Sequence, residues 1–529
     1  MQKIISLKLL PAEAADPALV QQYIAQATGV KTSSVTGYIP LKQSIDARGK
    51  QPWISLSLKA YINEPFEPRQ PLSFDFRDVS HAARKVVIIG AGPAGLFAAL
   101  RLIEKGIRPI ILERGKDVRA RRRDLAELNK QGEVNPESNY CFGEGGAGTY
   151  SDGKLYTRSS KRGDINRILN LFFHFGAEEQ VLYEAHPHIG TNKLPQIITA
   201  MRKTIRDCGG EFLFEKKVVD LILSDDRIKG VKTSGGDIFE GDAVILATGH
   251  SARDIFELLH HKKILVESKP FALGVRIEHP QSLIDKVQYH LPGISSKSGN
   301  LRPPGLPPAS YSWVQQVDGK GVFSFCMCPG GIIAPAATSP GELVVNGWSP
   351  SKRNNPYANS GIVVTVEEKD LQAFKKHGPL AGMQFQRSVE KKAFEAGGGK
   401  FVAPAQRLVD FAENKLSASL PGCSYLPGVH SASLKEVLPS FIYQSLREAF
   451  KEYGKKMKGY FTNEAVVVAT ESRTSSPVRI PRDPLTLQHP QIKNLYPCGE
   501  GAGYAGGIVS AAMDGERVSL QIERVFAND

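Results

Sequence analysis

Cysteine is scarce in this chain, and its spacing excludes several kinds of site. Only six cysteines occur among 529 residues, and none of them forms a C-x-x-C pair. This argues against a zinc ribbon, an iron–sulfur ferredoxin motif and a thioredoxin-type dithiol, and we predict no metal site. The one close pair is Cys326-Met-Cys328. Few cysteines in a long chain are typical of a reducing compartment.

The hydropathy pattern of the sequence also shows no membrane-spanning segment and no signal peptide. The first ten residues alternate apolar and polar side chains and lack the apolar core of a signal peptide. The longest uncharged run, residues 321–341, carries Pro329, Pro335 and Pro340, which would break a transmembrane helix. We therefore expect a cytoplasmic protein without a membrane span.

The composition is that of a globular protein with a basic balance. Hydrophobic residues make up 41% and charged residues 23%, which excludes a wholly disordered, collagen-like or coiled-coil chain. The formal net charge of +13 allows anionic partners such as nucleotides or nucleic acid. The densest basic run, residues 116–123, has helical surroundings and predicts a solvated helix face. A nucleic-acid partner stays open beside a small-molecule substrate, and the sequence does not specify an oligomeric state.

The first part of the chain, residues 1–75, predicts a small β-α-β-β module. Strands are expected at 2–10, 35–46 and 52–62. A helix is expected at 16–28, opened by an aspartate with proline at its first position. The order of these elements is ferredoxin-like.

Beyond a linker rich in proline and charge, the pattern changes to strands alternating with helices. Residues 84–270 predict the first part of a Rossmann-type nucleotide-binding domain. Residues 271–461 are richer in proline and glycine and predict an inserted mixed α/β substrate domain. Residues 462–529 are expected to return to the first domain. The expected fold class is therefore α/β, with an insertion and a small leading module.

A glycine-rich motif stands between a buried strand and an apolar helix. Residues 90–95 read G-A-G-P-A-G, which is G-x-G-x-x-G. The first glycine permits a tight turn, the second lets the backbone approach a pyrophosphate, and the third allows close helix–strand packing. Glu113 ends the next strand, about 20 positions further on, where a carboxylate binds ribose hydroxyls. The segment predicts a dinucleotide site.

Two further segments indicate which dinucleotide is bound. Residues 246–250 read L-A-T-G-H after an apolar strand, and residues 498–515 read CGEGAGYAGGIVSAAMDG. Together with the first motif, they resemble the glutathione-reductase-type FAD fold. The resemblance implies that the C-terminal glycines meet the flavin and that the following helix points its N-terminus at the ring. A helix dipole in that place would stabilise a reduced, anionic flavin.

Longer blocks resemble one family in particular, the uncharacterised bacterial FAD-dependent dehydrogenases. The resemblance covers nearly the whole chain and implies non-covalent FAD, but no substrate. The blocks are residues 42–48, 142–155, 187–194, 247–256, 270–281, 325–331, 346–360 and 471–483. The motifs and the resemblance together assign to the cofactor Gly90, Gly92, Pro93, Ala94, Gly95, Glu113, Arg114, Gly145, Gly146, Ser151, Asp152, Gly153, Lys154, Val218, Val219, Ala247, Thr248, Gly249, His250, Gly499, Glu500, Gly506, Gly507 and Ile508.

Two alternative nucleotide sites have weaker support in the sequence. Residues 148–155 nearly spell a P-loop, but Leu155 stands where a serine or threonine should hold Mg²⁺, and no apolar strand precedes the segment. No second G-x-G-x-x-G follows a strand, so a separate nicotinamide domain is not expected. Transient binding of NADH or NADPH as electron donor stays open.

The catalytic residues are not specified by any motif, and four candidates each have a structural alternative. Cys326 and Cys328, in an uncharged loop rich in glycine and proline, are either a redox pair or small buried hydrophobes. Arg276 either holds an anionic substrate or pairs with Glu278 on the same strand face. Arg473 either binds a carboxylate near the flavin or is solvated.

These observations lead to one main functional hypothesis and two alternatives. The main hypothesis is an FAD-dependent oxidoreductase that moves a hydride or electrons between flavin and a small organic molecule. An RNA-directed flavoenzyme is the second, although the N-terminal module lacks an aromatic-rich RNP string and a G-x-x-G clamp. The third is a non-catalytic flavin-binding protein, because cofactor motifs do not report turnover.

Overall fold

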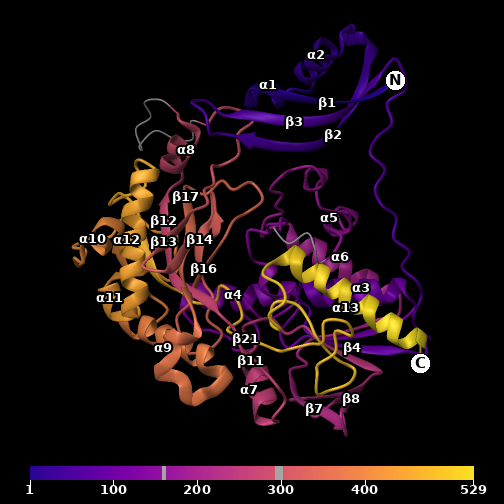
Figure 1. Cartoon of the computed structure of the whole chain (residues 1–529), viewed down its shortest axis with the longest axis vertical. Coiled ribbons are helices and arrows are strands. Elements are labelled where there is room, and N and C mark those ends of the chain that lie inside the picture. Colours follow the sequence, from indigo (N-terminus) through magenta and orange to yellow (C-terminus); the bar gives the residue numbers. More distant parts are fainter. Residues whose placement is uncertain (158–162, 292–301, 529) are drawn as a thin grey trace.

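The computed structural model describes residues 1–157, 163–291 and 302–528, and it separates into a small N-terminal module above two larger lobes (Figure 1). One lobe is built on a parallel sheet and the other on a larger, mostly antiparallel sheet. Within the described ranges, no helix has both the length and the apolar character needed to cross a membrane.

The N-terminal module is a three-stranded antiparallel sheet in the order β1-β3-β2, covered by a helix. The predicted helix is confirmed: Asp16 caps it by accepting a hydrogen bond from Ala18 N at 2.9 Å. Val20 and Ile24 of the helix pack on Leu56 and Leu58 of the sheet. The elements are β1 (Gln2–Leu9), α1 (Pro11–Ala14), α2 (Pro17–Thr28), η1 (Thr32–Ser34), β2 (Val35–Asp46) and β3 (Trp53–Ile62).

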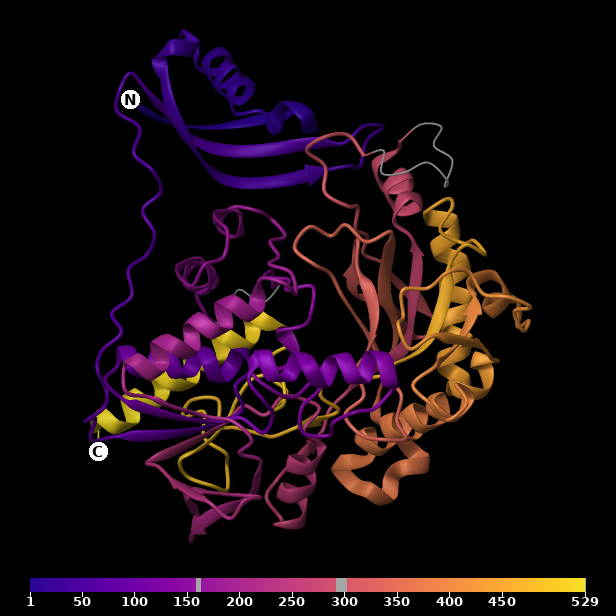
Figure 2. The same ribbon diagram turned by 180° about the vertical axis from the view of Figure 1, so that it is seen from behind.

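An extended linker joins this module to the parallel sheet. Figure 2 shows residues 63–84 running along the side of the molecule from the module to the first strand of the parallel sheet. The module also contacts the rest of the chain directly, because Gln43 N donates to Tyr183 O at 2.8 Å and Ala185 N donates to Gln43 O at 2.9 Å.

The parallel sheet has the order β22-β10-β4-β5-β6 and is buried on both faces. Side chains of β4 alternate, so that Val86 and Ile88 join the core under one helical layer while Val87 and Ile89 join the core on the other face. Its strands are β4 (Lys85–Ile89), β5 (Arg108–Leu112), β6 (Glu211–Leu213), β10 (Ala243–Leu246) and β22 (Leu495–Pro497).

Helices cover one face of this sheet, and a small antiparallel sheet with a helix covers the other. The C-terminal helix, α13, lies along α3 (Figure 1). The helices on the first face are α3 (Pro93–Glu104), α6 (Leu194–Asp207) and α13 (Ile508–Asn528). The other face is covered by β7 (Val218–Ser224), β8 (Arg227–Thr233), β9 (Ile238–Glu240) and α7 (Arg253–His261).

The larger sheet has the order β13-β14-β17-β12-β20-β18-β19. Along β12, Leu273, Val275 and Ile277 face the hydrophobic core, which leaves Arg276 and Glu278 on the other face. Its strands are β12 (Phe271–Pro280), β13 (Val314–Val317), β14 (Lys320–Cys328), β17 (Tyr357–Val366), β18 (Ala403–Arg407), β19 (Val429–Ser431) and β20 (Val466–Glu471), with α9 (Ala381–Ala396) and α12 (Ser440–Lys456) packed against it.

One strand lies on the other side of the boundary that the sequence predicts. β20 falls in the range 462–529, which was expected to return to the nucleotide-binding domain, but it pairs with β12 and β18 of the larger sheet. The apolar run of β20 fits either sheet, and only its pairing decides between them. The boundary expected at 461/462 is therefore too early.

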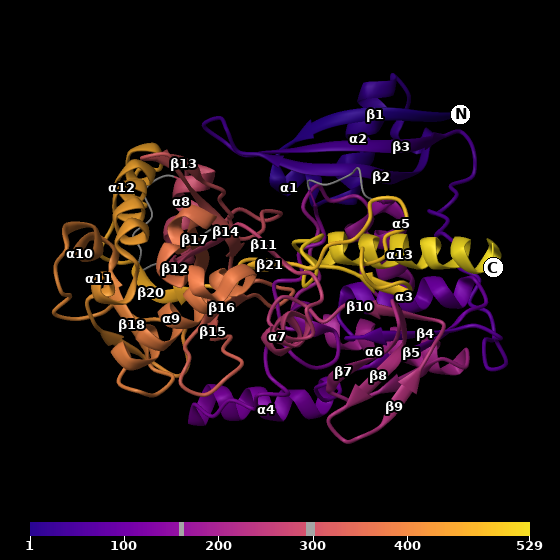
Figure 3. The ribbon, with the colours of Figure 1, turned by 60° about the horizontal axis from the view of Figure 1, so that its bottom comes forward.

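Helix α4 (Val118–Gln131) joins the two lobes. Figure 3 shows it lying beneath both lobes, and Leu128 packs there with Ala336 and Phe401. Arg119, Arg122 and Arg123 of its basic run are exposed, as the prediction of a solvated face requires, but Arg121 is not. Arg121 is completely buried and donates to Asn139 O and Glu144 O, both at 2.8 Å.

The remaining elements are η2 (Gly146–Gly148), α5 (Ile165–His174), η4 (Glu179–Leu182), β11 (Glu267–Ser268), α8 (Gln281–Tyr289), β15 (Ile332–Pro335), β16 (Val345–Trp348), η5 (Glu368–Leu380), α10 (Leu408–Glu413), α11 (Leu434–Val437) and β21 (Val478–Arg479).

The contact between α3 and α13 can be tested with one methyl group. A Cβ added at Gly515 would lie 2.1 Å from Ala94 O, so the two helices must separate to admit it. We expect Gly515→Ala to lower the free energy of unfolding by about 1–2 kcal/mol despite the better helix propensity of alanine. Thermal melting of the full chain measures this, with Gly235→Ala as control because its Cβ meets nothing closer than 3.5 Å. Equal melting temperatures for the two variants would contradict the prediction.

Candidate functional site

A cavity of about 850 Å³ lies where the carboxyl ends of β4, β5 and β10 face the larger sheet. Ligands of open α/β sheets bind at this edge of the strands. Most residues that the sequence assigns to a cofactor line the cavity: Gly90, Gly92, Pro93, Ala94, Glu113, Arg114, Gly146, Ser151, Asp152, Gly153, Lys154, Val218, Ala247, Thr248, Gly249, His250, Glu500, Gly506, Gly507 and Ile508.

Four assigned residues do not line the cavity. A Cβ at Gly95 would lie 2.0 Å from Gly90 O, so this glycine permits packing beneath the loop. Gly145 has φ +77°, where a Cβ would meet Thr149 Oγ1 at 2.0 Å. Gly499 donates its N–H to Asp514 Oδ2 at 2.8 Å. Val219 is 40% exposed and, on a strand, points away from its neighbour Val218.

Part of the cavity wall is glycine backbone, and no other atom of the described residues occupies the space next to it. A Cβ at Gly92 would meet only Gly146 Cα, at 4.0 Å, and one at Gly249 or Gly506 would meet nothing within 4 Å. These glycines are therefore not needed for packing within the protein. Their backbones can be approached closely by a ligand, as the second glycine of a dinucleotide motif requires.

Two helices begin at this cavity. Gly92 is the N-cap residue of α3 and offers no side chain to the free N–H groups of the first turn. α13 begins at Ile508, directly after Gly506 and Gly507, and these residues also line the cavity. The N-termini of α3 and α13 both place partial positive charge at the wall of the cavity, which favours an anionic ligand.

Glu113 ties together three loops around the cavity. Its carboxylate is 5% exposed and accepts hydrogen bonds from Ala91 N, Gly115 N and Gly143 N, each at 2.9 Å. An ionised carboxylate offers about four lone-pair positions, so three donors leave one position for a further donor.

A cluster of charged side chains forms another part of the wall. Asp152 is buried, and Arg353 Nε donates to its Oδ1 at 3.1 Å. Although burial acts in the opposite direction, the charges of Arg353 and Lys154 hold the pKa of Asp152 below its usual value. Lys154 Nζ donates to Met327 O, and thereby joins this cluster to the end of β14.

The four catalytic candidates differ in position. Cys326 and Arg473 line the cavity, whereas Cys328 and Arg276 do not. Both cysteines lie at the end of β14 rather than in a loop. Arg276 pairs with Glu471 at 2.6 Å instead of Glu278 and is completely buried. It therefore supports the sheet next to the cavity and cannot reach a substrate in it.

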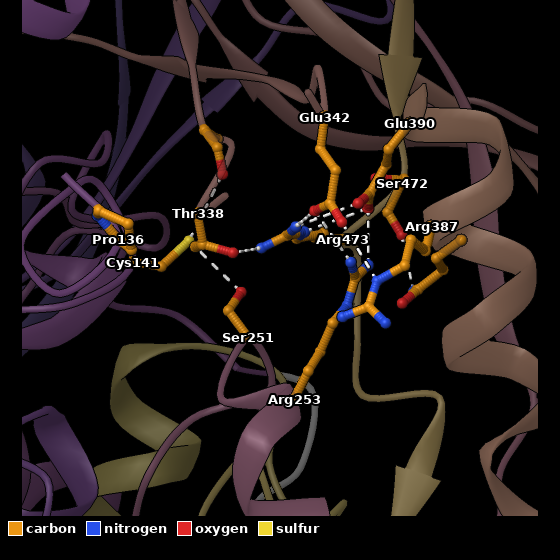
Figure 4. A network of polar contacts seen from close by, with 12 residues as sticks. Pro136, Cys141, Ser251, Arg253, Thr338, Glu342, Arg387, Glu390, Ser472 and Arg473 are labelled. Atoms are coloured by element: carbon orange, nitrogen blue, oxygen red, sulfur yellow. Dashed lines mark hydrogen bonds and ion pairs between the residues drawn. The ribbon is translucent and has the colours of Figure 1, made fainter. Parts of the chain in front are cut away.

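Arg473 belongs to a buried network that joins the two lobes (Figure 4). Glu390 of α9 lies between Arg253 of α7, at 2.8 Å, and Arg473, at 3.1 Å. Glu342 contacts the same two arginines, each at 3.2 Å. Arg473 is 8% exposed, which rules out the solvated alternative. Although burial raises the pKa of Glu390, the two arginines hold it far below its usual value.

Sequence reasoning missed a group of residues from the larger lobe. They line the cavity but carry no spacing signal of their own, because they come from separate strands and loops. Phe325, Met327, Asn346 and Arg353 do lie in blocks that resemble the family, but the resemblance assigned no role to them. These residues are Tyr311, Ser312, Ser324, Phe325, Met327, Asn346 and Arg353.

Comparisons with family models agree with the site. Residues 83–125 match the model of an FAD binding domain, and residues 270–474 match that of an FAD-dependent protein, C-terminal domain-like. Residues 1–61 match a domain of unknown function. The fold and the site therefore define an FAD-dependent protein of mixed α/β fold.

A relative that matches over nearly its whole length shows the family. An uncharacterized protein of Clostridium beijerinckii is 37% identical over 529 residues, which covers 97% of either chain. The present chain belongs to the same family of FAD-dependent proteins.

More distant similarities cover less of the chain or are weak. Thiamine thiazole synthase of Aeropyrum pernix is 26% identical over 187 residues, 32% of this chain and 57% of that protein. Among solved structures, CtdE in complex with FAD and substrate 4 matches with a TM-score of 0.34 and 12% identity, over 84% of this chain and 82% of that one. Similarity this low does not bear on function.

The buried network makes a prediction for stability. Glu390→Gln leaves Arg253 and Arg473 buried with the charge of Glu342 alone, and we expect a loss of about 3–5 kcal/mol in the free energy of unfolding. Urea unfolding at pH 7 measures it. Glu448→Gln is the control, because its pair with Lys451 is exposed (side chains 53% and 40%) and such pairs contribute about 0–1 kcal/mol. Equal losses in both variants would contradict the assignment.

The same network predicts a dependence on pH. The pKa of Glu390 is lower in the folded than in the unfolded chain, so its contribution is complete above the unfolded value of about 4.3. The contribution is lost as the pH falls below that value toward the folded pKa. The difference in stability between the native chain and Glu390→Gln should therefore stay constant from pH 7 to pH 5 and shrink below.

Proposed function

We propose that this protein is an FAD-dependent oxidoreductase that transfers a hydride or electrons between non-covalently bound FAD and a small organic substrate. The carrying observation is the cavity wall of open glycine backbone at which α3 and α13 both begin. FAD supplies the redox chemistry when it is bound, and the protein supplies position and electrostatics.

The residues present fit FAD. Gly92 and the N-terminus of α3 would hold the pyrophosphate, because bare backbone and free N–H groups favour phosphate oxygens. Glu113 would accept a hydrogen bond from a ribose hydroxyl through its remaining lone-pair position. Val218 would meet the adenine with its backbone. Gly506, Gly507 and the start of α13 would meet the flavin, where the helix dipole favours negative charge.

The substrate would lie against the part of the wall that the larger lobe supplies. Tyr311, Phe325 and Met327 give this part an aromatic and apolar surface, and Arg473 adds at its edge a guanidinium group that is already paired with Glu342 and Glu390. Mainly apolar walls with a few charged or polar groups are typical of pockets for small organic molecules. NADH or NADPH would reach the flavin only transiently, because the chain has no second dinucleotide motif.

Flavin content and reduction test the proposal. We expect the purified full-length protein to carry FAD that is released on denaturation. We also expect its visible absorbance to bleach on anaerobic titration with NADH or NADPH, or with a substrate found by metabolite screening. Protein that takes up no flavin even with added FAD would refute the proposal. Flavin that resists every donor would support non-catalytic binding instead.

The pyrophosphate cradle can be tested without disturbing the fold. Gly92 has φ −76°, which any residue adopts, and an added Cβ meets only Gly146 Cα at 4.0 Å. We expect Gly92→Val to keep the melting temperature of the flavin-free protein but to raise the dissociation constant for FAD at least tenfold, which is about 1.4 kcal/mol. Fluorescence titration measures this, with Gly49→Ala in the N-terminal module as control. Unchanged FAD affinity would argue against phosphate binding at Gly92.

A further inference from the structure

We propose that Cys326 and Cys328 form a redox-active pair in the wall of the cavity and that they reduce low-molecular-weight disulfides by thiol–disulfide exchange. The proposal rests on the proposed function only for the electrons that return the pair to its dithiol form. It assigns an activity and a substrate class to a part of the cavity that the FAD motifs do not account for.

The backbone at the end of β14 brings the two thiols together. In a regular strand, residues two apart point to the same face but lie about 6.6 Å from each other. Here the pairing of β14 with β17 is interrupted between Phe325 and Cys328, and Cys326 has φ +48°, in the left-handed region. As a result the two sulfur atoms are 4.0 Å apart. Backbone strain of this kind in a non-glycine residue is concentrated at functional sites.

The two cysteines differ in access to the cavity. Cys326 lines the cavity, together with Phe325 and Met327, whereas Cys328 is completely buried behind it. A ligand in the cavity therefore meets Cys326 first. Cys328 can react only with Cys326, which makes it the resolving partner.

Two cations surround the pair. Arg276 Nη2 donates to Cys326 O at 2.6 Å and lies 3.5 Å from Cys328 Sγ, and Lys154 Nζ donates to the carbonyl of the intervening Met327. The hydrogen bond from the Cys328 thiol, followed by the charges of Lys154 and Arg276, lowers the pKa of the Cys326 thiol well below its usual range. The same hydrogen bond and burial raise the pKa of Cys328. One thiolate and one thiol are the protonation states that exchange requires.

The oxidation of the pair balances with the substrate disulfide as the oxidant and water as the source of one proton. The Cys326 thiolate attacks one sulfur of the substrate disulfide, the substrate S–S bond breaks, and the first thiolate leaves and takes the proton of Cys328. The Cys328 thiolate then attacks Cys326 Sγ, and the second substrate thiolate leaves and takes a proton from water. Two cysteine thiols are oxidised and one disulfide is reduced to two thiols. Two electrons, from flavin or from an added dithiol, restore the pair.

The test uses the full-length protein and bis(2-hydroxyethyl) disulfide as probe, with peptide mass mapping as readout. We expect the native chain to form a bond between Cys326 and Cys328. Cys328→Ser should instead accumulate a mixed disulfide on Cys326, and Cys326→Ser should react at position 328 at least about tenfold more slowly. Cys208→Ser is the control, because Cys208 is half-buried outside the cavity. A native chain in which both thiols stay reduced, or a Cys328→Ser variant without the mixed disulfide, would overturn the proposal.

A second measurement isolates the role of Lys154 as a positioning residue. We expect iodoacetamide to modify Cys326 at pH 6 at least about tenfold faster than Cys208, whose pKa burial raises. Lys154→Met should move the pH profile of Cys326 modification upward, whereas Lys154→Arg should keep it near the native profile. Equal profiles in all three proteins, with unchanged melting temperatures, would contradict this role.

The outcomes separate this proposal from the proposed function. Exchange with the probe needs no flavin, so flavin-free protein should still form the Cys326–Cys328 bond. A chain that binds no FAD but forms the bond would refute the oxidoreductase proposal alone. A chain whose bound FAD is reduced by donors but whose cysteines do not react would refute the dithiol proposal alone.

Discussion

The buried carboxylate of Glu113 and the buried guanidinium of Arg121 hold one loop from two sides. Glu113 accepts the N–H of Gly143, and Arg121 donates to the carbonyls of Glu144 and, at 2.9 Å, Gly146. A charge without partners inside a protein costs several kcal/mol, so each group fixes the backbone that satisfies it. This loop brings Gly146 next to Gly92. The distance between the backbones of Gly92 and Gly146 therefore depends on two charged side chains that are themselves buried.

The shape of the cavity also depends on the position of the two lobes relative to each other. β20 leads directly from the larger sheet into Ser472 and Arg473, and both side chains contact Glu390, with Ser472 Oγ donating at 2.7 Å. Arg253 approaches the same carboxylate from α7, which packs against the other lobe. Removal of one partner leaves an unpaired buried charge, so the network penalises any separation of the lobes. The network thus fixes the position of the larger lobe's side of the cavity relative to the glycine loops.

Local spacing explains which parts of the structure could be predicted. The G-x-G-x-x-G motif between a strand and a helix, and the aspartate before Pro17, encode their own conformations within a few residues. The burial of Arg121 could not be predicted, because its acceptors are carbonyls about 20 residues away that only the folded loop brings together. Nor could the pairing of β20 be predicted, since a short apolar strand fits either sheet.

The distance between the two thiols and their charged surroundings could not be predicted from the sequence either. A C-x-C spacing on a regular strand would keep the thiols apart, and only the interrupted pairing of β14 with β17 turns Cys326 toward Cys328. The charge around the pair is likewise a product of the fold. Glu471 pairs with Arg276 at 2.6 Å, and Arg353 pairs with Asp152. Although burial acts in the opposite direction, the two cysteines then contribute more than Asp152 to the raised pKa of Lys154. The ammonium group of Lys154, which donates to the carbonyl of Met327 between the two cysteines, is therefore placed to stabilise a thiolate at Cys326 in the proposed exchange.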